Sequence, residues 1–308
     1  MSLFDKINET AAFIGKKIKS KPYIGISRYG SDPEFLMLND NGTYLIHTNP
    51  TTAIGVDGGG VLTELRPAPA YNVQEHLSNI KALLESPNLN YVRDKKWRAG
   101  ACVEAIQQCY AAHIGTPRES DYRNWLSMGG HIHIEIPYGT AGAIPAVEQK
   151  VFQARLDAFD HVTRTMEAAD LLPREESALR RSNGGYGAFG NYHSVNGADG
   201  QQRVEYRTPC SWLFSPKNAF ILFTAIKLAA VSPITVKRRI PENGTPEKIW
   251  EGFVKLFRDF QHIDHDSYIA VNRICKAVHA SNLERLGATK IVDLDFKAAW
   301  SPAKVEGK

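Results

Sequence analysis

The chain has few cysteines, no long apolar run and no phosphate-binding loop of the Gly-x-x-x-x-Gly-Lys-Ser/Thr type. Its four cysteines have neither metal-site spacing nor the density of a disulfide scaffold, which favours reduced thiols in a cytoplasmic setting. No apolar run approaches the length of a membrane span, and the first residues lack the basic-then-apolar order of a secretory signal. We therefore do not expect secretion, a membrane partner or a P-loop nucleotide site.

Neither sign of charge dominates the chain. The 37 basic and 33 acidic residues give a net charge of +4. Short basic runs at 16–19 and 237–239 are more typical of a solvated surface than of nucleic-acid contacts, so a nucleic-acid partner is disfavoured. With 308 residues, 43% of them hydrophobic, the chain can bury one large core.

Polar residues recur two positions apart inside four short apolar runs. The pairs are Asp32 with Glu34, Glu64 with Arg66, His131 with His133, and Glu205 with Arg207. Because side chains alternate across a strand, each pair would lie on one face, and the four strands could converge on one surface of a sheet. Burying so many charges without a metal or an anionic ligand costs too much free energy, so this surface predicts a binding site.

Each pair also has a structural interpretation when it is taken alone. Asp32 and Glu34 flank Pro33, which indicates a strand start or edge where carboxylates can reach Mg²⁺, but they also fit a turn and a surface position. The glycines at 58–60, between Asp57 and Glu64, could admit a phosphate or simply form a hairpin turn. The four pairs together favour a site, because four such coincidences are improbable.

The histidine pair is the most specific of the four. Two imidazoles that alternate with isoleucines face the same way, after glycines that would admit a ligand and before Glu135. Arg207 could clamp a carboxylate or phosphate while Glu205 holds a metal on the same group, although a surface ion pair is the alternative.

The strands alternate with segments of helical periodicity. Residues 22–70 are predicted to form strands and turns, and Asn72 with Glu75 suggests a capping box that opens a helix running to Leu84. Further helices are expected at 98–113, 152–166, 216–231, 246–260 and 266–281, whereas 180–190 has too many glycines for a helix. Strands that bear polar pairs, separated by helices that pack on the opposite face, predict an α+β fold.

Five segments resemble the carboxylate-amine ligases of the glutamine synthetase superfamily, and most closely the phage-type amidoligases called COOH-NH2 ligase type 2, or phiEco32-like. They are 30–35, 57–67, 129–133, 186–190 and 205–209. The resemblance implies an antiparallel sheet with an open catalytic face and helices on the other face, as in the glutamine synthetase catalytic domain. It also implies a division into an amidoligase domain at 1–235, with a short N-terminal arm, and a mostly helical extension at 236–308 packed on it.

The resemblance further implies roles for individual residues. The metal ligands would be Asp32, Glu34, Asp57, Glu64, His131 and Glu205. Arg66, Arg181 and Arg207 would act on the transferring phosphoryl group or the substrate carboxylate. The nucleotide would contact His133, Arg180, Tyr186, Gly187 and His193. His193 stands where related amidoligases tend to carry an arginine, so either it replaces that arginine or Arg180 and Arg181 handle the phosphate.

The implied activity is an ADP-forming ligase that uses ATP and two or more Mg²⁺ ions, with Mn²⁺ as an alternative, and that forms an amide through an acyl phosphate. Its partners would be small-molecule or peptide carboxylates and amines, with nucleic acid left open as a carrier of the modified group and a homo-oligomer left open as well. The setting would be a bacterial host cytoplasm. A metal-dependent hydrolase or oxygenase, and an inactive relative that serves as a phage structural or partner-binding protein, are the alternatives.

Overall fold

A computed structural model describes nine segments of the chain: residues 28–38, 44–45, 51–57, 62–85, 96–98, 128–135, 146–182, 187–196 and 202–279. The expected N-terminal arm, most of the expected helix at 98–113 and the chain beyond residue 279 lie outside these segments. Cys210 is buried and its sulfur accepts a hydrogen bond from Oγ of Ser177, whereas Cys102 and Cys109 fall outside the described residues.

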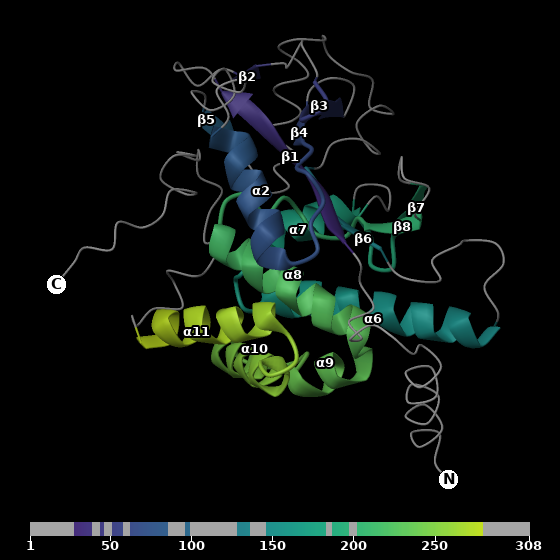
Figure 1. Cartoon of the computed structure of the whole chain (residues 1–308), viewed down its shortest axis with the longest axis vertical. Coiled ribbons are helices and arrows are strands. Elements are labelled where there is room, and N and C mark those ends of the chain that lie inside the picture. Colours follow the sequence, from purple (N-terminus) through teal and green to yellow (C-terminus); the bar gives the residue numbers. More distant parts are fainter. Residues whose placement is uncertain are drawn as a thin grey trace.

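The strands of the described segments form one sheet in which every pairing is antiparallel (Figure 1). They are β1 (Tyr29–Leu38), β2 (Tyr44–Leu45), β3 (Ile54–Asp57), β4 (Leu62–Leu65), β5 (Lys96–Arg98), β6 (Gly130–Ile134), β7 (Tyr192–Asn196) and β8 (Gln202–Tyr206). The order is β3-β4-β1-β6-β8-β7, and β2 and β5 pair with the C-terminal half of β1. The α+β class with an antiparallel sheet is therefore confirmed.

The register of the sheet brings the polar residues together. Glu34 of β1 lies opposite Glu64 of β4, and Asp32 lies opposite His131 of β6. His133 lies opposite Glu205 of β8. Because directly opposed residues of antiparallel strands project to the same side, the four pairs share one face of the sheet, as the sequence predicted.

The alternate residues of these strands face a core shared with three helices: α2 (Val73–Glu85), α6 (Ala146–Ala168) and α8 (Pro216–Val231). The ring of Tyr206 on β8 meets Phe159 of α6 edge to face at 5.4 Å, and Tyr29 on β1 meets Phe223 of α8 at 6.5 Å. All four rings are almost completely buried, and each such burial contributes about 1.5–3 kcal/mol. This packing fixes the strands that carry the polar residues.

Three further helices cover α6 and α8 on the side away from the sheet (Figure 1). They are α9 (Pro233–Arg239), α10 (Pro246–Phe260) and α11 (His265–His279). The helices predicted at 216–231, 246–260 and 266–281 are confirmed within two residues, whereas the domain boundary at 235 stays a prediction. In the described part of the chain, no helix has the length and apolar character needed to cross a membrane.

The prediction that Pro33 marks a strand start or edge was wrong. Pro33 lies inside β1, which is flanked by β4 and β6. The amide of Glu34 donates to Gly129 on the β6 side, so the missing N–H of Pro33 faces the β4 side. The residues of β1 that pair with β4 are Glu34 and Phe35. Pro33 lies just beyond this ladder, so its missing N–H disrupts neither of these two pairs.

The glycine-rich stretch is also shorter than predicted. Helix α7 (Arg174–Ser182) includes Arg180 and Arg181 in its last turn, so the first three residues of the stretch predicted to be non-helical are helical. Strand β7, which carries His193, was not predicted at all. It pairs with β8 at the edge of the sheet, and tertiary pairing of this kind leaves little trace in local sequence.

Candidate active site

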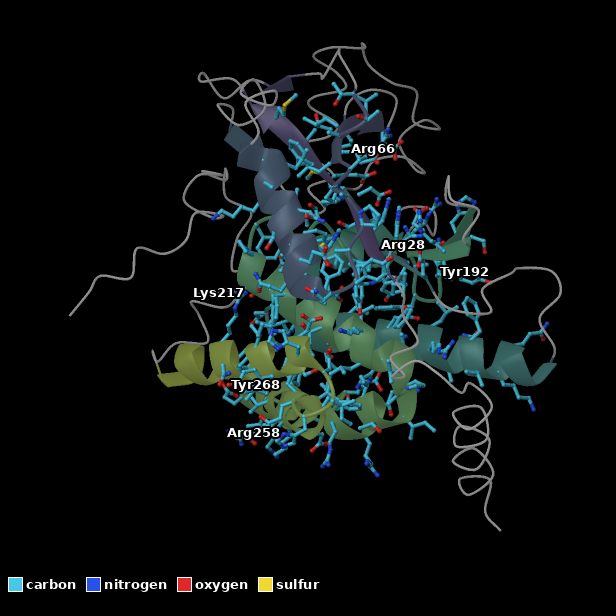
Figure 2. The ribbon with its side chains drawn as sticks, in the orientation of Figure 1. Arg28, Arg66, Tyr192, Lys217, Arg258 and Tyr268 are labelled. Carbon is cyan, nitrogen blue, oxygen red and sulfur yellow. The ribbon has the colours of Figure 1, made fainter. Side chains whose placement is uncertain are left out.

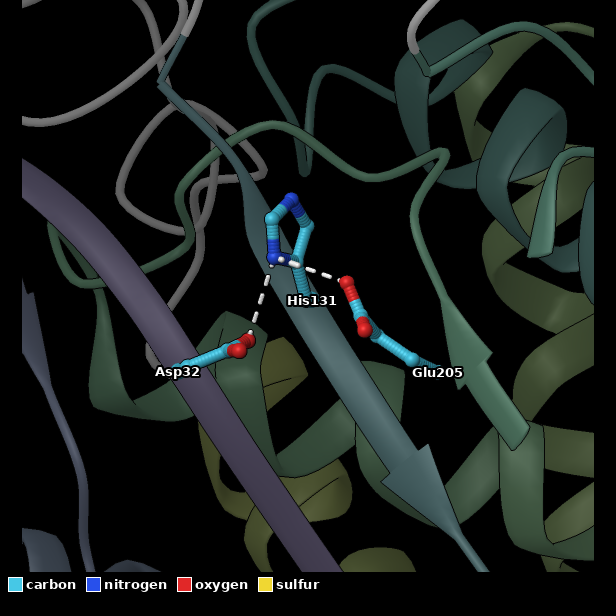
Figure 3. Close-up of side chains that lie close together, drawn as sticks. All are labelled: Asp32, His131 and Glu205. Carbon is cyan, nitrogen blue, oxygen red and sulfur yellow. Dashed lines mark ion pairs between the residues drawn. The ribbon is translucent and has the colours of Figure 1, made fainter. Parts of the chain in front are cut away.

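Asp32, His131 and Glu205 form a cluster across three adjacent strands, β1, β6 and β8 (Figure 3). Nδ1 of His131 lies 3.2 Å from Oδ1 of Asp32 and 3.4 Å from Oε1 of Glu205. One potential ligand atom from each residue lies within 4.8 Å of the other two. This carboxylate–histidine cluster therefore has the donor atoms and the spacing to hold a metal ion.

The environment of Asp32 tests whether the cluster fits a divalent cation. Oδ1 of Asp32 is buried and has no hydrogen bond of good geometry among the described residues, although His131 is near. Oδ2 of Asp32 lies 3.1 Å from Nε2 of His133. A buried carboxylate oxygen that accepts no hydrogen bond is well suited to bind a cation. Two carboxylates and one imidazole form a ligand set that fits Mg²⁺ or Mn²⁺.

Asp32 and His133 hold each other in their charged forms. Burial disfavours the carboxylate of Asp32, but the charges of His133 and His131, with the hydrogen bond of His133, outweigh burial and lower the pKa of Asp32. Burial likewise disfavours the imidazolium, but the charge and hydrogen bond of Asp32, with smaller effects of Glu205 and Glu64, raise the pKa of His133.

Glu34 and Glu64 form a second acidic group beside the cluster. Burial raises the pKa of Glu34 well above its usual value, and the charge of Asp57 adds to this effect. Burial also raises the pKa of Glu64, against the opposing bond from Arg66. Crowded buried carboxylates of this kind are stabilised in their charged form when a cation is bound. The predicted metal ligands Asp32, Glu34, Asp57, Glu64, His131 and Glu205 thus lie in one region of the sheet.

Two arginines border the carboxylate–histidine cluster. Nη2 of the fully buried Arg180 lies 3.2 Å from Nε2 of His131 and donates to the carbonyl oxygen of Arg207 at 2.9 Å. Nε of Arg207 donates to Oε1 of Glu205 at 2.6 Å. These contacts fix the orientation of both guanidinium groups.

Two glycines make room for Arg180. A Cβ at Gly129 would overlap the ring of His131 and stand 2.8 Å from Nη2 of Arg180. A Cβ at Gly187 would stand 2.6 Å from Nε of Arg180, and its φ of 86° is in any case a glycine conformation. Gly187, which was predicted to contact a nucleotide, therefore lies against Arg180, which was predicted to bind the phosphate. Tyr186 lies outside the described residues.

Arg181 points in another direction. Both of its terminal nitrogens donate to the carboxylate of Glu167 on α6, at 2.7 and 2.8 Å, and its guanidinium lies 4.5 Å from the ring centre of Phe189. His193 is 60% exposed, with Nδ1 3.6 Å from Oε2 of Glu205. The structure thus brings Arg180 to the cluster and His193 to its rim, and the catalytic role of Arg181 stays a prediction.

Sequence reasoning missed two arginines of the same sheet face. Nε of Arg203 and Nε of Arg28 lie 3.2 and 2.7 Å from the same oxygen of Glu135. Arg203 also lines a cavity of about 240 Å³ together with Arg66 and His133. Counting two residues back from Glu205 along the strand would have found Arg203, because the period-two pattern of β8 includes it.

Comparison with known proteins adds a family match. A family model described as phage phiEco32-like COOH.NH2 ligase-type 2 matches residues 29–258, which include every described strand. No curated protein matches the chain. Among solved structures, a bifunctional glutathione synthetase from Pasteurella multocida is similar at 11% identity and a TM-score of 0.48. That alignment covers 96% of this chain, which spans only 53% of the synthetase.

Proposed function

Because the chain belongs to the phage phiEco32-like COOH.NH2 ligase-type 2 family, we propose that it joins a carboxylate to an amine and cleaves ATP to ADP and phosphate. The observation that carries the proposal is the convergence of Asp32, His131 and Glu205 on one sheet face beside two preorganised arginines. A glutamine synthetase-like architecture and a bacterial host cytoplasm are parts of the same proposal.

The chemistry requires activation of the acid, because a carboxylate is a poor electrophile. A carboxylate oxygen attacks the γ-phosphorus of ATP, the bond from that phosphorus to the bridging oxygen breaks, and ADP leaves. The amine nitrogen then attacks the acyl carbon, phosphate leaves with the electrons of the C–O bond, and one amine proton passes to solvent. The catalytic demand is therefore to position the phosphoryl group and offset its charge.

The acidic residues would hold the cations that this reaction needs. Asp32, His131 and Glu205 fit one divalent ion, and Glu34 and Glu64, which are opposite each other on β1 and β4, would contribute ligands to a second. When bound, Mg²⁺ or Mn²⁺ would offset negative charge on the phosphate oxygens.

The arginines would orient the reacting groups. Arg207 is held by Glu205, and Arg180 is held by the Arg207 carbonyl, so each guanidinium presents N–H groups beside the cluster with little freedom to lose. Arg66, which bonds to Glu64 at 2.9 Å, would meet the acid or phosphate from the β4 side. His133 would contact a nucleotide phosphate.

The decisive experiment measures ADP release with Mg²⁺ and ATP against pooled acids and amines, followed by mass spectrometry of the product. Oxygen-18 placed in the substrate carboxylate should appear in the released phosphate, and hydroxylamine should trap the acyl group as a hydroxamate. AMP and pyrophosphate would instead indicate acyl-adenylate chemistry and refute the proposal.

The effect of Mg²⁺ and ATP binding on thermal stability tests the same proposal independently. ATP at about a hundred times its dissociation constant should stabilise the fold by roughly 2.7 kcal/mol when Mg²⁺ is present. A folded protein whose melting temperature does not respond to Mg²⁺ and ATP would favour the inactive-relative alternative. Metal-dependent bond cleavage without ATP would favour the hydrolase.

A further inference from the structure

The cavity of about 240 Å³ lies over Gly30, next to the carboxylate–histidine cluster. Gly30 is directly opposite His133 of β6, and a Cβ at Gly30 would stand 3.2 Å from Cβ of His133. The missing side chain therefore leaves a depression in a sheet face that is otherwise crowded with polar groups. Asp32 belongs both to the wall of this cavity and to the carboxylate–histidine cluster, so a ligand in the cavity would touch the cluster.

The far wall of the cavity is cationic. Arg203 lines it, and Nε of Arg203 shares one oxygen of Glu135 with Nε of Arg28. Arg28, Arg203 and Glu135 form a trio of two guanidinium groups and one carboxylate, with a net charge of +1. A guanidinium carries five N–H donors in a fork that matches a carboxylate, so Arg203 can hold Glu135 and a ligand at once.

The β4 side of the cavity carries a second guanidinium. Arg66 lines the wall and bonds to Glu64, and a Cβ at Gly55 would overlap the guanidinium of Arg66, so that glycine leaves it space. In Figure 2 the labelled Arg66 and Arg28 lie among the strands, away from Tyr268 and Arg258 of the outer helices. An occupant of the cavity would thus meet the cluster and Arg66 at one end and Arg203 at the other.

We propose that this cavity binds the acid substrate, and that Arg203 binds a second carboxylate of that substrate, remote from the reacting one. The substrate class is then a short dicarboxylic acid. This inference rests on the proposed ligase function, because it assigns the reacting carboxylate to the end next to the cluster.

The size of the cavity favours an acid over a nucleotide. A volume of about 240 Å³ accommodates a short acid of a few carbons. It is below the roughly 300–1,000 Å³ typical of pockets for drug-sized ligands, and a nucleoside triphosphate is larger still than most of those. Most of the nucleotide would therefore lie outside this cavity, beside the cluster, with a phosphate reaching His133 at the cavity edge.

The test is calorimetric titration of acetate, succinate and glutarate in the presence of Mg²⁺ into the wild type, Arg203→Gln and Arg28→Gln. Arg28 is the matched control, since it belongs to the same trio but does not line the cavity. The wild type and Arg28→Gln should bind one of the dicarboxylates at least tenfold more tightly than acetate, and Arg203→Gln should lose that preference. Arg203→Lys, which keeps the charge without the fork, should fall between them and serves if Arg203→Gln does not fold.

Three results would overturn the inference: equal binding of acetate and both dicarboxylates by the wild type, an unchanged preference in both Arg203 variants, or a larger loss of Mg²⁺-dependent ATP binding than of dicarboxylate binding in the Arg203 variants. The last result would make the cavity a phosphate site. If the ligase proposal itself is wrong, the binding and ADP-release results would differ from these three. Dicarboxylates would then bind with the expected dependence on Arg203, while ATP would not bind and no ADP would form.

Discussion

Glu205 is the residue that connects the cluster to the arginines. Its Oε1 lies 3.4 Å from His131 and 2.6 Å from Arg207, and its Oε2 lies 3.6 Å from His193. The side chain is almost fully buried, although it carries a charge. A buried carboxylate beside a guanidinium and two imidazoles is more useful for organising a site than for stability, because its desolvation offsets much of the attraction.

Glu205→Gln should keep the fold and lower Mg²⁺-dependent ADP formation by about 10²- to 10³-fold, because a neutral amide cannot replace a charged metal ligand. The measurement is ADP release at saturating Mg²⁺ and ATP. His193→Asn is the control. His193 approaches Glu205 from the exposed rim, so its replacement should change the rate much less. Wild-type turnover in Glu205→Gln would remove Glu205 from the site.

Neighbouring arginines give a second test at the same scale. Arg207→Lys keeps the charge but loses the planar fork, so kcat should fall while ATP affinity changes little. Arg181→Lys breaks the two-bond pair with Glu167 instead, and should cost about 1–3 kcal/mol of stability with kcat nearly unchanged. Steady-state kinetics and urea unfolding of both variants separate the two roles. A kcat loss in Arg181→Lys equal to that in Arg207→Lys would support the sequence prediction that Arg181 is catalytic.

At the scale of elements, strand β1 is joined to helix α2 by a buried polar contact. Oγ of Ser31 lies 2.8 Å from Nε2 of His76, beneath the strand that carries Asp32 and Glu34. His76 also packs against Phe223 of α8, with ring centres 5.1 Å apart. Burial lowers the pKa of His76 to about 4, so the imidazole is neutral in the folded protein near pH 7.

This burial predicts a pH dependence of stability. The pKa of His76 is about 4 when folded and about 6.5 when unfolded, so below pH 6.5 the unfolded chain binds a proton that the folded chain does not. The free energy of unfolding should therefore fall as the pH drops from about 6.5 to about 4, by roughly 3 kcal/mol from this residue. Urea unfolding across this range should show a shallower decline for His76→Gln than for the wild type. His262→Gln, at an exposed position, should retain the wild-type slope, and equal slopes in all three proteins would contradict the assignment.

At the scale of the whole molecule, a buried ion trio ties the outer helices to the sheet. Nζ of Lys227 on α8 lies 2.7 Å from Asp264 and 2.8 Å from Asp266 of α11. Asp266 also accepts a bond from the amide of Val73 at the start of α2, and Lys227 lies 5.9 Å from the ring centre of Tyr29 on β1. One cluster thus joins four elements that are far apart in the sequence.

Lys227→Met should destabilise the protein by about 3–5 kcal/mol, because it leaves two buried carboxylates without their cation. Lys217→Met, at an exposed position of the same helix (Figure 2), should change stability by no more than about 0.5 kcal/mol. Both are measured as free energies of unfolding in urea. A loss below about 1 kcal/mol in Lys227→Met would mean that the trio does not hold the helices to the sheet.

Much of the fold could be predicted from the sequence because the patterns are local. The period-two pairs at Asp32, Glu64, His131 and Glu205 lie on strands, and their side chains share a face, as the alternation of a strand requires. The apolar periodicity of α2, α6, α10 and α11 also depends only on residues a few positions apart. The family resemblance is carried by the same short segments, and the family match agrees with it.

Only the tertiary structure decided which of these residues meet. Whether Arg180 or Arg181 reaches His131 depends on where α7 ends and on how it rotates against α6, and these depend on packing across long sequence separations. The cavity over Gly30 exists because β1 pairs with β6 in a register that places that glycine opposite His133 and beside Arg203 of a third strand. Hydrophobic and charge patterns specify the face of a strand, but pairing order and register are set by the whole core, and so the site is assembled only when the chain folds.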